Sequence, residues 1–212
     1  MTDAELTSLA NRAQAVNYVL LGALGIFGLT LIGEVLELVG VIDLAAYEVG
    51  PLEALYGVLL ILHTVIFIVS VIVVCMWIYR AHANLRDYGI EGLEFSPGWA
   101  VGWYFIPLAN LFKPFQAMKE LYNTSFGADD RFGGDAPGNL GVWWGAWIIG
   151  NILGNVSMRI SLMGDGSNMQ VAIVLSLISS VCMIVSAYLL REIVLQVTEA
   201  QRTGLVPTQV FE

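Results

Sequence analysis

The sequence predicts an all-α membrane protein, a polytopic helical bundle with four transmembrane helices and a short, proline-broken helix at one surface. Composition is the first observation, because 57% of the 212 residues are hydrophobic and 13% are charged, whereas soluble proteins carry about 25% charged residues. The second observation is that the apolar residues gather in stretches of about 20, the length of helix that crosses a bilayer. Lipid offers no hydrogen bonds to the backbone, so such stretches must be helical.

The apolar stretches predict four transmembrane helices in one membrane domain over residues 1–202. They cover, in chain order, about 17–41, 54–79, 140–162 and 169–190. An amphipathic helix over 2–16 is predicted to lead into the first span along the membrane surface. An acidic loop over 43–53 follows that span, and a polar, glycine-rich loop over 125–139 precedes the third. Residues 203–212 are predicted to form a mobile tail.

The segment over 96–124 is predicted to be a re-entrant or interfacial element that does not cross the membrane. Ser96 and Pro97 are typical of a helix start, but Pro107 interrupts the apolar run of 15 residues that follows. Fifteen residues of helix reach about 22 Å, which is short of the roughly 30 Å of a bilayer core. A second helix is predicted to begin at Pro114.

Basic residues near the ends of spans mark the cytosolic side. If residues 96–112 enter the membrane and return, eight of the nine Lys and Arg residues lie on one side, and Arg159 lies opposite. If the segment crosses, the division becomes four against five. The six tryptophans also gather near the same surface in the first arrangement, as amphipathic rings do at a membrane interface. We therefore expect both termini in the cytosol and the acidic 43–53 loop outside.

Polar residues within the predicted spans form a candidate intramembrane site, because ionisable groups at membrane depth are costly and are functional candidates. They are Glu34, Glu37, His63, Asn151, Asn155 and Arg159. Two interpretations stay open. In one, Arg159 pairs with Glu34 or Glu37 as a structural clamp, with the two asparagines hydrogen-bonded between helices. In the other, the residues line a polar cavity that opens to the outside and binds an ion, a proton or a polar solute.

The stretch from Trp77 to Ser125 carries the most distinctive motif. Its residues are Trp77, Arg80, Asn84, Ser96, Pro97, Gly98, Trp103, Pro107, Asn110, Leu111 and Pro114. This pattern resembles the core signature of a bacterial integral-membrane family, domain of unknown function 4328. The resemblance implies a protein of the bacterial inner membrane and supplies no activity. Physically, Arg80, Asn84 and Asn110 either meet at the cytosolic mouth of a pathway or belong to a structural plug shaped by proline and asparagine.

Several classes of function are excluded or disfavoured. The formal net charge of −9 argues against nucleic acid as a partner. Cys75 and Cys182 lie in separate apolar stretches, outside any spacing typical of metal ligands. The sequence has no nucleophile–base constellation, phosphate-binding loop or dinucleotide fingerprint. We therefore expect a protein that is not an enzyme and that uses no cofactor and no metal.

Two functions remain. The sequence favours a structural or accessory protein whose partners are the lipid bilayer and another membrane protein or a second copy of the chain. Gly150 and Gly154 form a GxxxG motif that serves close helix packing, either within the chain or between copies. This function predicts complete pairing of Glu34, Glu37 and Arg159 with no cavity. The alternative is a small channel or carrier with an outer polar cavity and an inner re-entrant gate.

Overall fold

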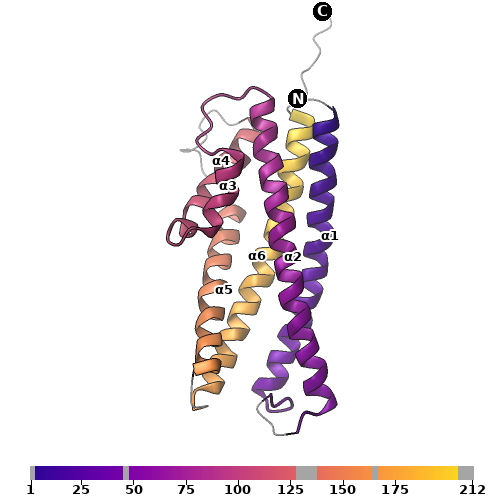
Figure 1. Cartoon of the computed structure of the whole chain (residues 1–212), viewed down its shortest axis with the longest axis vertical. Helices are drawn as coiled ribbons and strands as arrows, with labels where there is room; N and C mark the ends of the chain where they lie inside the picture. The colour runs from indigo at the N-terminus through magenta and orange to yellow at the C-terminus, as the bar shows by residue number, and fades with distance from the viewer. Residues whose placement is uncertain (1–2, 45–47, 128–137, 164–166, 205–212) are drawn as a thin grey trace, which may run out of the picture. The chain divides into compact units, whose positions relative to one another are not determined.

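The structure is a computed structural model that describes residues 3–44, 48–127, 138–163 and 167–204. Within these ranges every regular element is helical, which confirms the all-α class (Figure 1). The elements are α1 (Asp3–Leu38), α2 (Pro51–Asp87), α3 (Pro97–Gly102), η1 (Trp103–Phe105), η2 (Ala109–Leu111), α4 (Lys113–Ser125), α5 (Gly138–Met163) and α6 (Met169–Gly204).

Three helices run beyond the spans that hydropathy predicts. The helix α1 is continuous from Asp3, so the surface helix predicted over 2–16 and the first span are one element. The helix α2 continues to Asp87 and α6 to Gly204. The added turns bury apolar side chains such as Leu9, Leu85 and Val197 completely. Packing of these side chains, rather than contact with lipid, explains why the helices continue. Residues 205–212 of the predicted tail, and 128–137 of the predicted loop, lie outside the described residues.

Three helices are long and apolar enough to cross a membrane, which makes the chain a multi-pass membrane protein. In the described residues they span Ala4–Leu38, Pro51–Asp87 and Met169–Gly204. Their exposed faces are strongly apolar; on α2, for example, Leu55 is 66% exposed and Ile61 is 65% exposed. Such faces suit lipid and would be a liability in water. The helix α5 has 26 residues and is not among these three, because tryptophan, glycine and asparagine lower its mean hydropathy.

The chain folds into two compact units, and α1, α2, α5 and α6 contribute residues to both. Unit 1 comprises Met1–Tyr18, Val71–Gly141 and Leu189–Glu212, and unit 2 comprises Val19–Ser70 and Val142–Tyr188. Of the eight Lys and Arg residues in the described ranges, seven belong to unit 1 and Arg159 belongs to unit 2. The single membrane domain expected over 1–202 remains a prediction.

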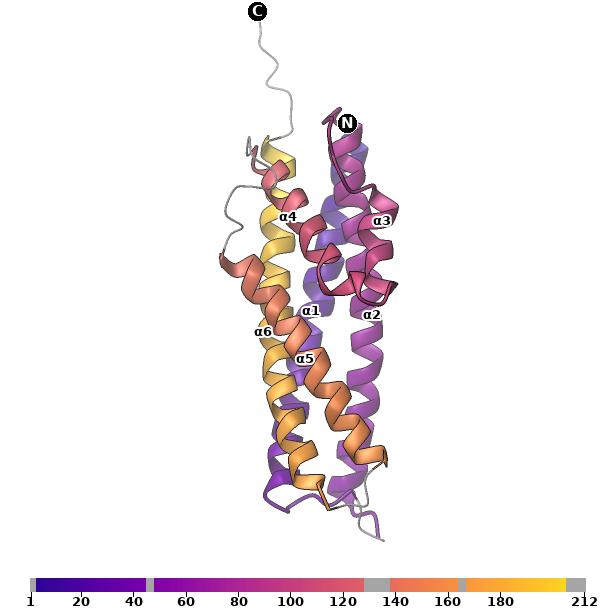
Figure 2. The same cartoon turned by 90° about the vertical axis from the view of Figure 1, so that its left-hand side faces the viewer.

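In unit 2, α5 and α6 lie side by side and approach closely (Figure 2). A Cβ atom at Gly154 would lie 2.9 Å from Ser179 Oγ, and one at Gly150 would lie 3.1 Å from Met183 Sδ. The Ser179 hydroxyl donates a hydrogen bond to the Gly150 carbonyl at 2.8 Å, and Ser157 donates to the Ala172 carbonyl at 2.7 Å. The GxxxG motif therefore serves packing within the chain.

In unit 1, the segment between α2 and α4 doubles back on itself. Ser96 Oγ accepts a hydrogen bond from Trp99 N and caps α3, as the sequence predicts. The helix ends after six residues, and η1 and η2 follow on either side of Leu108, whose φ of 66° is left-handed. The segment ends where it began, because Lys113 Nζ lies 3.3 Å from Glu94 Oε1. It is thus a short hairpin-like excursion and not a continuous helix.

Candidate functional site

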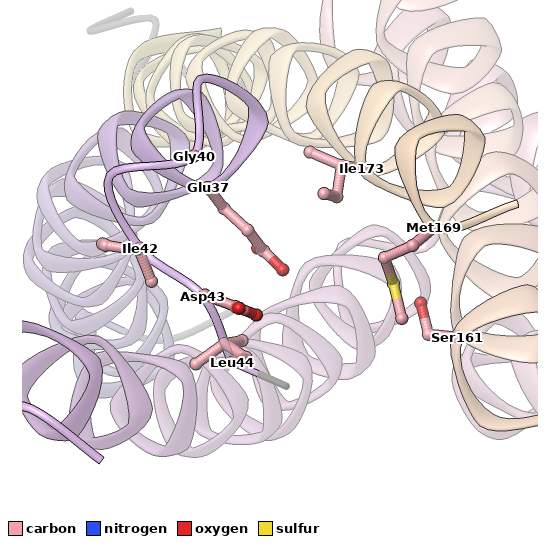
Figure 3. A pocket seen from close by; sticks show the side chains of 8 residues that line it. All are labelled: Glu37, Gly40, Ile42, Asp43, Leu44, Ser161, Met169 and Ile173. Atoms are coloured by element: carbon pink, nitrogen blue, oxygen red, sulfur yellow. The ribbon is translucent and has the colours of Figure 1, made fainter. Parts of the chain in front are cut away.

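A cavity of about 420 Å³ lies in unit 2, where α1 ends and α6 begins (Figure 3). The carboxylates of Glu37 and Asp43 point into it, and Ser161 and Met169 lie across from them. No Lys or Arg side chain is among its described lining residues. Clefts lined by one sign of charge concentrate ions of the opposite sign. The cavity is therefore suited to cations.

Glu34 lies one turn from Glu37 on the same face of α1 and is 5% exposed. Its Oε1 accepts hydrogen bonds from the hydroxyls of Ser176 and Ser180, the latter at 2.9 Å, and both serines belong to α6. Its Oε2 is buried and has no hydrogen-bond partner in the part of the chain that the structure describes. An unpartnered carboxylate oxygen in apolar surroundings carries a large desolvation cost. One oxygen of Glu34 is thus hydrogen-bonded and the other is not, so that a proton or a cation could bind to Oε2.

A second polar contact occupies the next turn of α1. Thr30 Oγ1 donates a hydrogen bond to the Ile26 carbonyl at 2.9 Å and lies 3.3 Å from His63 Nδ1. Because the threonine proton is already donated, its oxygen accepts from a protonated Nδ1. The His63 ring also packs against Phe27, with ring centroids 4.4 Å apart and the ring planes tilted by 31°. Glu37, Glu34 and Thr30 therefore form a row of polar groups along one face of α1, with His63 bonded to its inner end.

The row is closed on one side by Tyr56 from α2. Its ring is 4% exposed and lies so close to Gly33 that a Cβ at that position would be 2.2 Å from Tyr56 Cε2. Glycine is required there because the two helices have no space for a side chain between them. The Tyr56 ring therefore packs tightly against α1 at the residue that precedes Glu34.

The structure differs from the predicted clamp. Arg159 is exposed, and no ion pair joins it to Glu34 or Glu37 among the described residues. Asn151 and Asn155 donate to the carbonyls one turn back on their own helix, each at 2.8 Å, and Asn151 Nδ2 also lies 3.9 Å from Met183 Sδ of α6, as the predicted interhelical bonding expects. The physical reason is that serines from α6, rather than an arginine from α5, bind Glu34, through its Oε1. Of the six predicted residues, the structure brings Glu34, Glu37 and His63 onto one row and leaves the three of α5 outside it.

Sequence reasoning missed Thr30, Asp43, Tyr56, Ser176 and Ser180. Hydroxyls are common in membrane helices as interhelical hydrogen-bond donors, so a single serine carries little information. The available signal is the spacing of four between Ser176 and Ser180, which places both on one helix face. Two serines on one face of a helix predict a contact with a glutamate of another helix only when it is known that the two helices are neighbours.

The motif residues of unit 1 have separate partners and do not converge. Asn84 is fully buried, and its Nδ2 donates to Gln201 Oε1 at 3.3 Å, joining α2 to α6. Gln201 in turn donates to the Ala81 carbonyl at 3.1 Å and to Ser125 Oγ at 3.0 Å. Trp77 Nε1 donates to Thr198 Oγ1 at 3.0 Å between the same two helices. This network is a structural joint between α2, α4 and α6.

Arg80 and Asn110 have surroundings of their own. Arg80 pairs with Glu5 at 3.5 Å and with Asp87 at 3.2 Å, so it links α2 to α1. The Oδ1 of Asn110 is buried without a hydrogen-bond partner among the described residues. Pro97 stands in the first turn of α3, and Pro114 in the first turn of α4, where proline is tolerated. No hydrogen bond links Arg80, Asn84 and Asn110 to one another in the described residues, and both roles predicted for them stay predictions.

Sequence reasoning also missed the burial of two titratable residues of unit 1, Glu120 and His82. Glu120 is fully buried, and its two oxygens accept from Glu94 N at 2.7 Å and from Phe95 N at 3.2 Å. These bonds fix the start of the doubled-back segment. His82 is 1% exposed, with Nδ1 3.0 Å from the Ile78 carbonyl oxygen and Nε2 3.3 Å from that of Ala117.

A comparison with curated proteins and one with solved structures found no match. The family model described as Domain of unknown function (DUF4328) matches residues 42–199. The matched range includes α2, the doubled-back segment, α4, α5 and most of α6, and with them the joint around Asn84 and the two serines that bind Glu34. The match covers well over half of the chain and agrees with the resemblance carried by Trp77 to Ser125. The chain therefore belongs to the DUF4328 family.

Proposed function

We propose that this protein is a small carrier or channel of the bacterial inner membrane that moves protons through Glu34. The observation that carries the proposal is the half-satisfied carboxylate of Glu34, one turn from an acidic cavity. A structural carboxylate would have both oxygens paired, because burying an unpartnered charge costs several kcal/mol. A carboxylate that repeatedly gains and loses a proton needs a state in which one oxygen is available.

The surroundings of Glu34 support proton uptake from the cavity. Glu37 and Asp43 raise the local cation concentration at the cavity, and Glu37 lies one helical turn from Glu34. Glu34 is in turn one helical turn from Thr30, which contacts His63. Rows of carboxylate and imidazole groups at membrane depth are typical of proton relays. The serines keep Glu34 in place in either protonation state, since a hydroxyl can donate to a carboxylate or accept from a carboxylic acid.

We propose a topology of four crossing helices, with α5 as the fourth, and with the doubled-back segment and both termini on the cytosolic side. The contact between Glu94 and Lys113 supports this arrangement, because a segment whose two ends touch has not crossed a bilayer. The distribution of basic residues supports the proposed orientation, because seven of the eight described Lys and Arg residues belong to unit 1 and Arg159 belongs to unit 2. The exposed Ile149 and Ile152 give α5 a lipid-facing side in spite of its weaker hydropathy.

Proton flux into sealed liposomes tests the activity. The wild type, reconstituted with a pH-sensitive dye inside, is expected to pass protons under an imposed gradient, and Glu34→Gln is expected to reduce the flux to that of empty liposomes. Glu48→Gln is the matched control, because this exposed residue of the same unit lies outside the row, and it should behave as the wild type. Repeating the assay with Na⁺ or K⁺ gradients identifies another cation if one is carried.

The result that contradicts the proposal is wild-type flux at the level of empty liposomes for every cation tested. The accessory role that the sequence favoured would then be the better account. Equal flux for the wild type and Glu34→Gln would instead remove Glu34 from the pathway. Reaction with a hydrophobic carbodiimide, followed by mass spectrometry of the peptide, gives an independent measurement, since this reagent modifies protonated carboxyls in apolar surroundings. Glu34 should be modified and Glu48 should not.

Cysteine labelling tests the topology in a background in which Cys75 and Cys182 are replaced by serine. Tyr88→Cys precedes the doubled-back segment, and Gln116→Cys follows it. Both are expected to react with a membrane-impermeant maleimide from the cytosolic side, and Glu48→Cys from the opposite side. Labelling of Tyr88→Cys and Gln116→Cys from opposite sides would show that the segment crosses the membrane.

A further inference from the structure

A second cavity, of about 260 Å³, lies in unit 1 at the neck of the doubled-back segment. Arg86 and Lys113 line it, and they come from the end of α2 and the start of α4. Trp99 and Trp103 form another part of its wall. We propose that this cavity binds the phosphate group of an anionic phospholipid. The site is independent of Glu34 and of the proton pathway, and depends only on the chain being a membrane protein.

The two cations retain the capacity to bind a phosphate. Arg86 uses Nη2 to donate to the Phe95 carbonyl at 3.3 Å, and a guanidinium has five N–H donors in all. Lys113 Nζ lies 3.3 Å from Glu94 Oε1 and 5.3 Å from the centre of the Phe95 ring. The Glu94 side chain is 53% exposed, so solvent weakens its attraction for the lysine. A phosphate would replace this exposed carboxylate with a more strongly charged acceptor.

The aromatic wall and the segment beyond it match a lipid rather than a free ion. The rings of Trp99 and Trp103 lie 4.8 Å apart, and Trp99 is 54% exposed. Tryptophan prefers the depth of the lipid head groups, where its ring is half in apolar surroundings. The tip of the segment exposes large apolar side chains that water would not favour. These are Phe105, Leu108, Leu111 and Phe112, each at least 50% exposed.

Leu108 strengthens this assignment. It is the described non-glycine residue with positive φ, at 66°, and it is 77% exposed. A left-handed leucine costs about 1 kcal/mol or more, and the turn presents its side chain away from the protein. Insertion of this tip among acyl chains would offset that cost by burying apolar surface. The tip in the acyl region would then hold the neck, with Arg86 and Lys113, at the level of the phosphates.

Lipid retention by the purified full chain tests the proposal. Native mass spectrometry in detergent compares phosphatidylglycerol with phosphatidylcholine, and we expect the wild type to retain the anionic lipid preferentially. Each basic residue near a membrane surface is worth about fivefold in affinity for anionic lipid, so Arg86→Gln with Lys113→Gln should lose about thirtyfold. The matched control, Lys119→Gln with Arg202→Gln, removes two charges of unit 1 outside the cavity and should keep the preference.

Glu94→Gln is a variant for which we expect a gain, rather than a loss, of affinity for the anionic lipid. It removes the carboxylate that competes for Lys113, and it leaves in place the backbone N–H that binds Glu120. We expect it to bind phosphatidylglycerol more tightly than the wild type does. A gain of affinity cannot arise from failure to fold, which guards against a trivial loss in the Arg86 and Lys113 variant.

Three results would overturn the inference. The first is an unchanged lipid preference in Arg86→Gln with Lys113→Gln, and the second is weaker binding in Glu94→Gln. The third concerns the source of the phosphate: inorganic phosphate at low millimolar concentration that displaces the lipid would make the ligand a free phosphate. Inorganic phosphate without effect supports the lipid, because the acyl chains and the apolar tip then contribute to the affinity.

Discussion

Gly33→Ala is expected to destabilise the protein, although alanine is the better helix former. In an open helical position this change stabilises by about 0.5–1 kcal/mol. At position 33, however, the new Cβ would lie 2.2 Å from Cε2 and 2.5 Å from Cδ2 of Tyr56. Tyr56 is 4% exposed, so it is packed on nearly all sides, and overpacking of this kind costs about 1–3 kcal/mol. The matched control is Gly28→Ala in the same helix, where no atom lies within 4 Å of the new Cβ.

Thermal unfolding in detergent, followed by tryptophan fluorescence, measures the difference between the two variants. The overpacking cost of about 1–3 kcal/mol separates them, and in a chain of this length each kcal/mol shifts the midpoint by about 2–4 °C. Gly28→Ala should unfold at or above the wild-type temperature, and Gly33→Ala below it. Adding Tyr56→Leu to Gly33→Ala should recover part of the loss. Equal midpoints for the two alanine variants would refute the close approach of α1 and α2 beside Glu34.

Two further predictions concern helix pairing. Thr198→Val leaves the buried N–H of Trp77 without its acceptor and should cost about 1–3 kcal/mol in thermal unfolding, whereas Thr203→Val on an exposed turn of α6 should cost little. Gly154→Val forces α5 away from Ser179 and should lower the unfolding temperature while leaving the oligomeric state, measured by light scattering, as in the wild type. A change of oligomeric state with unchanged stability would show that the GxxxG motif serves contacts between copies.

The helical class and the approximate centres of the helices could be predicted, because bilayer physics leaves few alternatives for long apolar stretches. The ends of the helices could not be predicted, because the turns beyond the apolar stretches depend on tertiary contacts. Leu9, Leu85 and Val197 are fully buried, yet their neighbours in sequence are polar, and nothing local shows which partner covers them. The doubled-back segment could be predicted as short and proline-broken, because its form depends on local residues. These are Ser96, Pro97 and Pro107.

The candidate site was predicted only in part, because the sequence does not show which helices pair with one another. An ionisable residue in an apolar stretch can be found by inspection, which is how Glu34, Glu37 and His63 were identified. The partners of such a residue cannot be found in this way, because they depend on which helices are neighbours and on the register in which those helices pack. Charge complementarity suggested Arg159 as a partner, but a long arginine near a helix end can reach water or head groups instead. Glu34 is bonded by Ser176 and Ser180, whose hydroxyls carry no charge signal in the sequence.

Two buried glutamates of this chain offer a test of the difference between structure and function. Glu120 is fully buried, and each of its oxygens accepts from a backbone N–H, of Glu94 and of Phe95. In Glu120→Gln an amide NH₂ would face one of these N–H donors, so the variant loses one charge-assisted bond and gains a repulsive contact. That should cost about 1.5–3 kcal/mol or more in thermal unfolding.

Glu34→Gln should behave in the opposite way. The glutamine oxygen can still accept from Ser176 and Ser180, and its NH₂ takes the place of an oxygen that has no partner among the described residues. The variant removes the desolvation cost of a buried charge, so its unfolding temperature should equal or exceed that of the wild type while proton flux is lost. Residues kept for function at the expense of stability show this combination. A large loss of stability in Glu34→Gln, similar to that of Glu120→Gln, would instead identify Glu34 as a structural residue, because only a carboxylate with both oxygens engaged has that much to lose.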